Sequence, residues 1–454
     1  MKLFFSTSKI VLLVSLFIMF NACSKSENAV VSETPVIPWD GFVPAATADI
    51  VMYEINPSSF SASKNLQGIT NRLDNIKALG INTIWIMPIY PIGVTNSFGS
   101  PYCIKDYTSV RSSLGNLQDL KNLVTAAHQK GIAVLLDWVA NHTSWDNTWI
   151  TTNPYWYTHN SSGQIISPAG TGWNDVADLD FNNTAMRTAM INAMKYWVTE
   201  ANVDGFRCDA ADYVPYDFWA QANTALKTIP NKQLILLAEG SRADHFTAGF
   251  QMNFAWDYLG TEKGVFGTTQ ASANTFFTTN ASEYSVVPNG KKKLRFTTNH
   301  DESNIATPIS VYGGNNGALA ASVVSIYLQG VPLLYCGQEV GVSSTATYNG
   351  TNTIDWTANS AMLAAYTDLF SFYNASSTAR TGVLTTYSDA NVVVFSKVSA
   401  SQQVLVLDNI RNSSQTLAVP TALQGDWTNA LTGSSVTLSA SLGLTSFQYM
   451  ILKR

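Results

Sequence analysis

An alternation of strand-like and helix-like patterns between residues 50 and 336 constrains the fold more than any other feature. Buried-type strands are predicted at 49–56, 81–87, 132–136 and 203–206, and amphipathic helix patterns lie between them. Strands that alternate with helices in this way favour a parallel sheet. Further strands at 234–238, 251–254 and 331–335, together with the run leading to Asp301, bring the predicted number to eight.

Helix boundaries support the same reading. One helix is predicted over 66–79, because five apolar residues recur there at helical spacing and Gly80 follows as a C-cap. A second helix is predicted to begin at Asn116, whose side chain would be joined by Asp119 in capping it, and to end at Gly131.

Four of the apolar runs lead to a carboxylate. They are Asp137-Trp-Val-Ala-Asn-His142, Gly205-Phe-Arg-Cys-Asp209, Leu237-Ala-Glu239 and Thr298-Asn-His-Asp301. We interpret each run as a strand end. Asp209 and Glu239 are 30 residues apart, the length of one strand–helix unit, and Glu239 and Asp301 are 62 apart, about two units. This spacing predicts an eight-stranded β/α (TIM) barrel, whose chemistry lies at the C-terminal ends of the strands.

Two segments depart from the barrel pattern. Residues 141–182 are rich in Trp, Tyr, Asn and Gly, and are predicted to be an insertion after the third strand. After about residue 376, short strands at 391–395, 403–407, 416–419 and 447–452 alternate with turn residues. The predicted organisation is a catalytic barrel over 46–375 and a C-terminal β-sandwich domain over 376–454.

The acid-ended segments favour cleavage of glycosidic bonds, which needs two carboxyl groups at one anomeric carbon. Arg207 and Asp209 are two apart on a strand and face the same side, so the guanidinium is expected to keep Asp209 ionised as a nucleophile. Glu239 ends an apolar run, where burial would raise its pKa and suit a general acid. Asp301 beside His300 could hold sugar hydroxyls.

These segments resemble the four conserved regions of the α-amylase family of glycoside hydrolases. The resemblance implies that Asp209 is the nucleophile, Glu239 the acid/base and Asp301 the residue that binds sugar hydroxyls and distorts the ring. It assigns substrate binding and support of the site to a further set of residues, namely Arg207, His142, His300, Asp137 and Tyr102.

The resemblance also implies a structural Ca²⁺ ion. Asn141 and Asp178 match two calcium ligands of the family, and Tyr213 stands where a main-chain carbonyl serves as a third. Oxygen ligands on an inserted loop suit Ca²⁺; the alternative is that Asn141 and Asp178 only bond loop backbone. Many α-amylases have Lys-His where this chain has Asp212-Tyr213, which bears on leaving-group preference.

The expected activity is retaining endo-hydrolysis of α-1,4-glucosidic bonds in starch, glycogen or maltooligosaccharides. Two alternatives keep the same site: a cyclomaltodextrinase- or neopullulanase-like hydrolase, and a 4-α-glucanotransferase. A third, from another class, is a non-catalytic glucan-binding lipoprotein. Retention of Asp209, Glu239 and Asp301 argues against that third alternative.

The N-terminus resembles a bacterial lipoprotein signal. The apolar run from Ile10 to Phe20 follows Lys2 and Lys9, is too short to span a bilayer, and stops just before Cys23. We expect a signal peptide over 1–22, a lipid anchor on Cys23 and a tether over 23–45, at the bacterial outer membrane or cell surface. A secreted or periplasmic protein is the alternative.

Composition limits the kinds of binding partner that the chain is expected to have. Net charge is only −5 with no basic runs, so nucleic acid is not an expected partner. The other three cysteines, Cys103, Cys208 and Cys336, fit no disulfide framework or zinc motif. We expect a monomer that binds an α-glucan.

Overall fold

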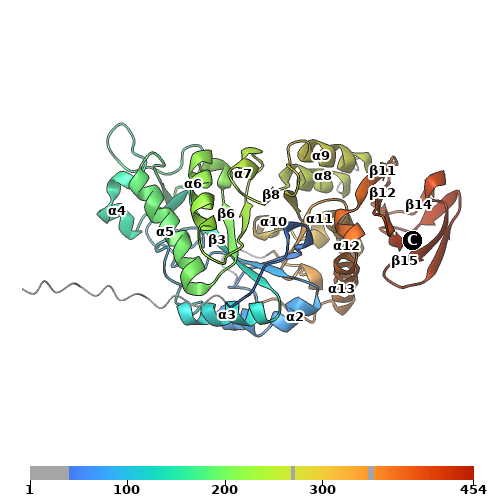
Figure 1. Ribbon diagram of the computed structural model, residues 1–454, viewed down its shortest axis with the longest axis horizontal. Coiled ribbons are helices and arrows are strands. Elements are labelled where there is room, and N and C mark those ends of the chain that lie inside the picture. The colour runs from blue at the N-terminus through green and yellow to red at the C-terminus, as the bar shows by residue number, and fades with distance from the viewer. Residues whose placement is uncertain (1–39, 267–270, 346–351) are drawn as a thin grey trace, which may run out of the picture. The chain divides into compact units, whose positions relative to one another are not determined.

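Eight parallel strands close into a barrel in the order β1-β10-β9-β8-β7-β6-β3-β2 (Figure 1). This computed structural model describes residues 40–266, 271–345 and 352–454, which all belong to one compact unit, Ile37–Arg454. The predicted barrel is therefore confirmed. Its strands are β1 (Met52–Ile55), β2 (Thr83–Ile86), β3 (Ala133–Val139), β6 (Gly205–Asp209), β7 (Ile235–Ala238), β8 (Met252–Phe254), β9 (Lys292–Arg295) and β10 (Val331–Tyr335).

The alternation of side chains along each strand separates two hydrophobic cores. Along β1, Met52 packs inside the barrel, whereas Tyr53 and Ile55 pack against the outer helices. Along β6, Phe206 and Cys208 pack outward. Glu54 and Arg207 therefore point inward, where apolar side chains otherwise fill the interior.

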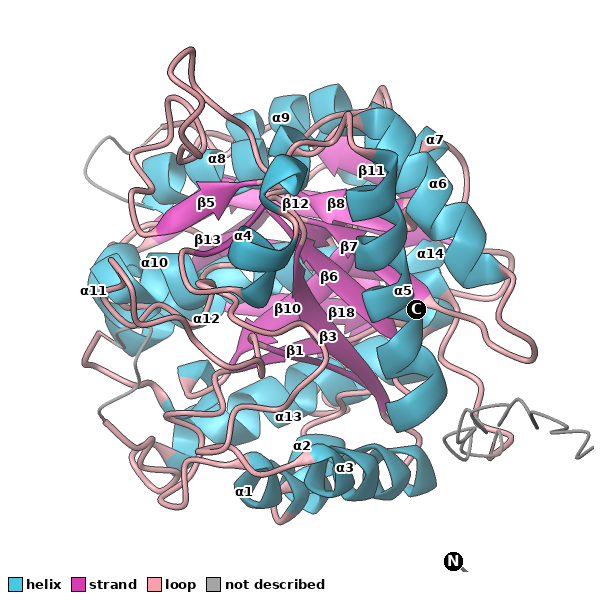
Figure 2. Ribbon diagram, turned by 90° about the vertical axis from the view of Figure 1, so that its left-hand side faces the viewer, coloured by secondary structure: helices cyan, strands magenta, loops and turns pink. Residues whose placement is uncertain are grey.

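Helices surround the strands on the outside of the barrel (Figure 2). The longer ones are α3 (Leu117–Gln129), α5 (Thr184–Ala201), α6 (Tyr216–Lys227), α8 (Trp256–Phe266), α9 (Asn274–Tyr284), α12 (Gly314–Tyr327) and α13 (Ser360–Ala375). The short ones are α1 (Leu66–Thr70), α2 (Leu73–Ala78), α7 (Asp244–Thr247), α10 (His300–Ile305), α11 (Pro308–Tyr312) and α14 (Ser377–Thr381).

The helix boundaries confirm one prediction and correct another. The capping box of α3 is present: Asn116 accepts from the backbone of Asp119, whose carboxylate accepts from Asn116 N–H at 2.9 Å. The single helix predicted over 66–79 is wrong. It divides into α1 and α2 at Arg72, which leaves the helical conformation and lies with its guanidinium 3.9 Å from the ring centroid of Trp356.

The fourth acid-ended segment also differs from its prediction. Strand β9 ends at Arg295, so Asp301 does not end a strand. It lies in the first turn of α10, where the Asn299 side chain caps the helix by accepting from the backbone N–H of Glu302 at 2.9 Å.

The segment after β3 forms the predicted insertion, which projects beside α5 (Figure 1). It holds a two-stranded antiparallel sheet of β4 (His142–Ser144) and β5 (Val176–Asp178), with α4 (Thr148–Thr152) and η2 (Pro154–Trp156) between them. The pairing sets His142 opposite Asp178, so both ends of the insertion meet near the barrel.

An all-β region follows α14, as predicted. One sheet has the order β11-β12-β13-β18-β15-β16, and β14 pairs with β17 in a second. The prediction found four strands, β12 (Val392–Val398), β13 (Gln403–Asn409), β14 (Gln415–Ala418) and β18 (Tyr449–Lys453). It missed four that are mostly exposed and have no apolar run, β11 (Val383–Tyr387), β15 (Gly425–Asn429), β16 (Ser435–Leu438) and β17 (Ser441–Leu444).

The β region contacts the barrel side directly. Arg411 donates from Nη1 to the carbonyl of Val265 and from Nη2 to that of Ala271, both at 2.7 Å. The rings of Phe266 and Phe447 stack with centroids 6.4 Å apart. These contacts join the end of α8 to the sheet.

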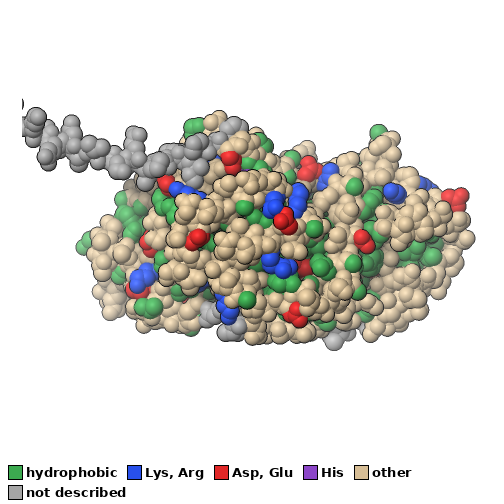
Figure 3. All heavy atoms as spheres, turned by 90° about the horizontal axis from the view of Figure 1, so that it is seen from below, with side chains coloured by type: hydrophobic (Ala, Val, Ile, Leu, Met, Phe, Trp, Pro, Cys, Tyr) green, Lys and Arg blue, Asp and Glu red, His purple; other side chains and the backbone are tan. Residues whose placement is uncertain are grey.

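The predicted signal peptide and lipid anchor on Cys23 lie outside the described residues and stay predictions. Among the described residues, no helix is long and apolar enough to cross a membrane. On the face shown in Figure 3, acidic and basic side chains are scattered among each other, without a continuous stripe of either sign.

Candidate active site

One buried guanidinium binds three carboxylates at the C-terminal end of the barrel. Arg207 Nη1 lies 2.8 Å from Asp137 Oδ1 and 2.8 Å from Asp209 Oδ1, and Nη2 lies 2.9 Å from Glu239 Oε1. Strand register brings them together, because Asp137 pairs with Arg207 between β3 and β6. Three of the four predicted segments therefore meet at one cation: segment 205–209 supplies Arg207 and Asp209, and the other two supply Asp137 and Glu239.

The backbone between β6 and β7 fixes the second carboxylate. Glu239 Oε2 accepts a hydrogen bond from the backbone N–H of Ala210 at 2.6 Å. Ala210 adopts a left-handed conformation with φ of 45°, which is uncommon for a residue with a Cβ. Such local strain recurs at functional sites, where surrounding contacts hold it in place.

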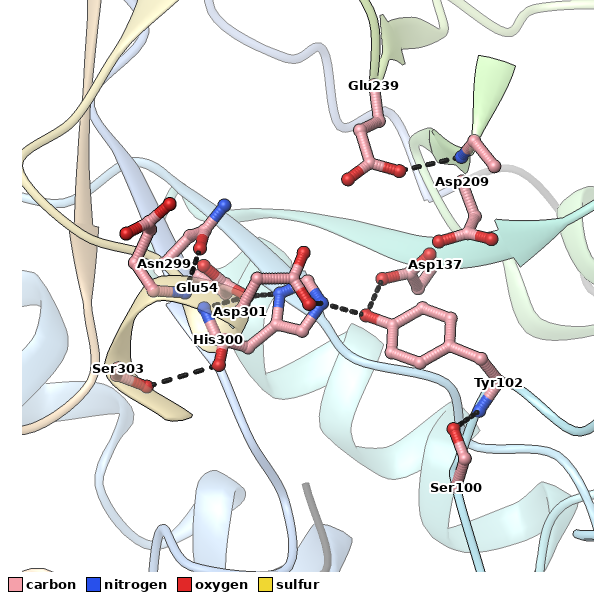
Figure 4. Close-up of polar contacts among 12 residues, drawn as sticks. Glu54, Ser100, Tyr102, Asp137, Asp209, Glu239, Asn299, His300, Asp301 and Ser303 are labelled. Atoms are coloured by element: carbon pink, nitrogen blue, oxygen red, sulfur yellow. Dashed lines mark hydrogen bonds and ion pairs between the residues drawn. The ribbon is translucent and has the colours of Figure 1, made fainter. Parts of the chain in front are cut away.

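A cavity of about 190 Å³ opens above this cluster. Figure 4 shows Asp209 and Glu239 on one side and Asp301 with His300 on the other. The residues that line it are Phe98, Ser100, Tyr102, His142, Trp173, Asp175, Val176, Asp209, Ala210, Glu239, His300 and Asp301. Six of the predicted site residues thus face one cavity: the three acids, Tyr102, His142 and His300.

Arg207 and Asp137 are among the residues predicted to bind substrate or support the site, and the structure places neither in contact with the cavity. Both are fully buried and neither lines the cavity. Asp137 Oδ2 instead accepts hydrogen bonds from Trp85 Nε1 at 3.0 Å and from the Tyr102 hydroxyl at 3.1 Å. The two residues therefore form the floor that supports the acids, rather than a surface that touches a ligand.

Burial raises the pKa of both facing carboxyls. Desolvation outweighs the attraction of Arg207 and raises the pKa of Asp209 to about 6, so the predicted ionised form of Asp209 predominates only above that pH. Desolvation likewise raises the pKa of Glu239 to about 7, as predicted in direction. Both carboxyls therefore hold a proton at a higher pH than an exposed acid does.

Sequence reasoning missed Glu54, a fully buried acid on β1. Its Oε1 lies 2.6 Å from His300 Nδ1 and also accepts from the backbone N–H of His300 at 3.3 Å. His300 Nε2 lies 2.7 Å from the Tyr102 hydroxyl, and the two rings stack with centroids 5.2 Å apart. A charged residue within the apolar run 49–56 was the available signal.

His300 carries a positive charge at neutral pH. Burial lowers its pKa, but the negative charges of Asp301 and Glu54 outweigh burial and raise the pKa to about 9. The other cavity histidine behaves in the opposite way. Burial lowers the pKa of His142 to about 4, so His142 is neutral and its ring packs against Trp173 with centroids 5.5 Å apart.

Two of the three predicted calcium ligands are neighbours. The backbone N–H of Leu179 donates to the Asn141 carbonyl at 3.3 Å, and Asp178 lies on the paired strand β5. Burial raises the pKa of the half-buried Asp178 carboxyl, and among the described residues no cation pairs with it, which fits a cation ligand. The ring of Tyr213 packs at a tilt against Trp173, with centroids 5.3 Å apart.

In the described part of the chain, no three His, Cys, Asp or Glu residues form a metal-binding group. Any Ca²⁺ site would rest on amide, carboxylate and carbonyl oxygens, the ligands that this cation prefers.

The family model for the alpha-amylase catalytic domain matches residues 54–164 and 152–368, well over half of the chain. The chain belongs to the alpha-amylase family. An alpha-amylase of Haloarcula japonica is 30% identical over 322 residues, which cover 67% of this chain and 46% of that protein. The matched part thus spans about half of that relative's length.

Solved structures of the family share the fold over nearly their whole length. An alpha-amylase from Lactobacillus plantarum has 26% sequence identity and a TM-score of 0.81, covering 90% of this chain and 99% of that one. A maltogenic alpha-amylase from Thermotoga neapolitana has 25% identity, a TM-score of 0.81 and the same coverage. Barrel, insertion and C-terminal β region therefore form an arrangement found among these enzymes.

Replacing Glu54 with glutamine tests whether Glu54 raises the pKa of His300. Removing the buried negative charge leaves the imidazolium with Asp301 as its counter-charge, so the pKa of His300 falls by about one unit or more. The chain has five histidines, few enough to assign by NMR and to titrate individually. Glu302→Gln is the matched control, because Glu302 lies on the same helix as His300 but pairs with Lys263 of α8. An unshifted His300 titration in Glu54→Gln contradicts this role.

Proposed function

We propose that the protein hydrolyses internal α-1,4-glucosidic bonds of starch, glycogen or maltooligosaccharides with retention of configuration. Asp209 attacks the anomeric carbon through Oδ2, since Arg207 holds Oδ1. Glu239 gives its proton to the glycosidic oxygen, and the leaving chain departs. Water, deprotonated by Glu239, then attacks the glycosyl–Asp209 ester and restores both carboxyls.

The observation that carries this proposal is that Arg207 forms ion pairs with both Asp209 and Glu239. Retaining enzymes need their two carboxyl groups only about 5–5.5 Å apart, whereas inverting enzymes leave room for a water between them. Adjacent nitrogens of one guanidinium contact the two side chains at 2.8 and 2.9 Å, which keeps them close. Asp301, on the far side of the cavity, is placed to bind hydroxyls of the same ring.

The leaving-group side of the cavity departs from the commoner family pattern. Asp212 stands where many α-amylases have lysine, and its carboxylate accepts from the backbone N–H groups of Ser241 at 3.0 Å and Arg242 at 3.2 Å. It therefore fastens the loop after Glu239 instead of offering a cation to a sugar. This difference, with the maltogenic relative, supports cyclomaltodextrinase-like hydrolysis or glucanotransfer as the second candidate.

The pKa order of the two carboxyls predicts a narrow pH optimum. Below the Asp209 pKa of about 6 the nucleophile is protonated, and above the Glu239 pKa of about 7 the acid has lost its proton. The kcat/KM for maltooligosaccharides should therefore peak between these values and fall on both sides. With maltotriosyl fluoride, whose leaving group needs no proton, the alkaline fall should disappear. A profile flat through neutral pH contradicts the assignment.

Asp209→Asn tests the nucleophile and separates enzyme from binding module. Release of reducing sugar from soluble starch should fall by at least about 10⁴-fold, because no other group can form the ester. Asp217→Asn is the control, since Asp217 is exposed on α6 and pairs with Arg187. Equal release by both variants contradicts the nucleophile, and no release even by the wild type favours a non-catalytic glucan-binding protein. Product sizes from starch, pullulan and cyclodextrin distinguish the two catalytic candidates.

A structural Ca²⁺ ion held by Asn141, Asp178 and the carbonyl of Tyr213 forms part of the proposal. It would join the insertion to the loop after β6 and take no part in bond cleavage. Ca²⁺ at about 100 times its Kd should add about 2.7 kcal/mol to the free energy of unfolding, seen as a rise in Tm. Asp178→Asn should abolish the rise, and Asp217→Asn should keep it. A Tm unmoved by Ca²⁺ and by EDTA refutes the site.

A further inference from the structure

A groove of about 780 Å³ lies away from the catalytic cavity and shares none of its lining residues. One face of α5 forms one wall, the loop 105–109 forms another, and the start of α4 closes one end. Figure 1 shows α4 next to α5. Its volume is within the range of sites that hold small organic ligands.

The helix wall is one stripe of α5 with small residues in its middle. Ala189 lies three and four residues before Asn192 and Ala193, and Tyr196 lies four and three residues after them, so all four share one side of the helix. The methyl groups of the two alanines leave the groove open between the polar side chain of Asn192 and the ring of Tyr196. Larger side chains at 189 and 193 would fill the space against loop 105–109.

Two partly exposed aromatic rings line this groove. Trp149 stacks one face on Tyr107, with centroids 5.2 Å apart and an interplanar angle of 29°, and meets the edge of Trp156 at 5.0 Å. Tyr196 packs edge-on against Trp197 at 5.2 Å. Both rings stay half-buried, so each keeps apolar surface that a ligand could cover.

The polar groups of the groove favour a neutral ligand. Lys105 is paired with Asp146 at 3.0 Å, and Asp106 accepts from the N–H and hydroxyl of Thr108 at 2.8 and 2.9 Å. Lys105 is thus engaged in an ion pair, and the Asp106 carboxylate is engaged in hydrogen bonds within its own loop. Among the described residues, the indole N–H of Trp149, the amide of Asn192 and the hydroxyl of Tyr196 have no hydrogen-bond partner.

We propose that this groove is a second, non-catalytic binding site for an α-glucan chain. Flat apolar rings with a polar tip suit the faces of sugar rings, and uncommitted neutral donors and acceptors suit their hydroxyls. The occupant follows from the proposed function, on which the inference rests: a protein that cuts α-glucan meets long chains of it. A site outside the cavity would hold such a chain while another part of it is cut.

Affinity electrophoresis in gels containing amylopectin tests the groove. Each protein carries Glu239→Gln, so that the polymer is not cut during the run. Tyr196→Ala removes one ring, and Ala189→Arg fills the groove without removing any packing. Tyr155→Ala is the control, because Tyr155 is 80% exposed on the same insertion and does not line the groove. Gels with barley β-glucan test for the glucan linkage, and Tm shows that each variant is folded.

The parent should be retarded by amylopectin and not by β-glucan, and both groove variants should bind about tenfold more weakly, while Tyr155→Ala binds as the parent does. Equal retardation of the parent and Ala189→Arg overturns the site, as does a parent that is not retarded. The outcome is separable from the proposed function, which is measured as starch hydrolysis by the wild type. Loss of retardation in the variants supports the groove even if the wild type releases no sugar.

Discussion

The site depends on a cation that is completely removed from water. Arg207 lies inside the barrel with no exposed surface, and such a charge is tolerated only where opposite charges and hydrogen bonds compensate it. Asp137, Asp209 and Glu239 provide that compensation from three different strands or strand ends. Removing one partner of a buried pair typically costs about 3–5 kcal/mol, so stability and the placement of the acids are linked.

The barrel and the catalytic acids were predictable because they follow local rules. The spacing of the apolar runs predicts the eight-stranded barrel, and the alternation along 205–209 places Arg207 and Asp209 on one face of their strand. Capping residues marked helix boundaries near the expected positions, as at Asn116, where α3 begins. These features depend on residues close together in the chain.

The contacts of Glu54 could not be predicted in the same way. Its partner His300 is 246 residues away, and only closure of the barrel between β1 and β10 brings the two together. The prediction that Asp301 ends a strand failed for a related reason, because four residues lie between the end of β9 and the start of α10, which holds Asp301. The pKa of Asp209 depends on how much water the folded cavity excludes. This burial cannot be predicted from the spacing of Arg207 and Asp209 in the sequence.

The charge balance around the cavity connects these observations. Five carboxyl groups, Glu54, Asp137, Asp209, Glu239 and Asp301, surround two cations, Arg207 and His300. Negative groups in excess repel one another and lose solvation, and the raised pKa values of Asp209 and Glu239 are the result. The transition state of glycoside cleavage carries positive charge on the sugar ring. A cavity that holds surplus carboxylates before the sugar arrives is therefore stabilised most when that charge develops, so the strain of the empty site favours the proposed reaction.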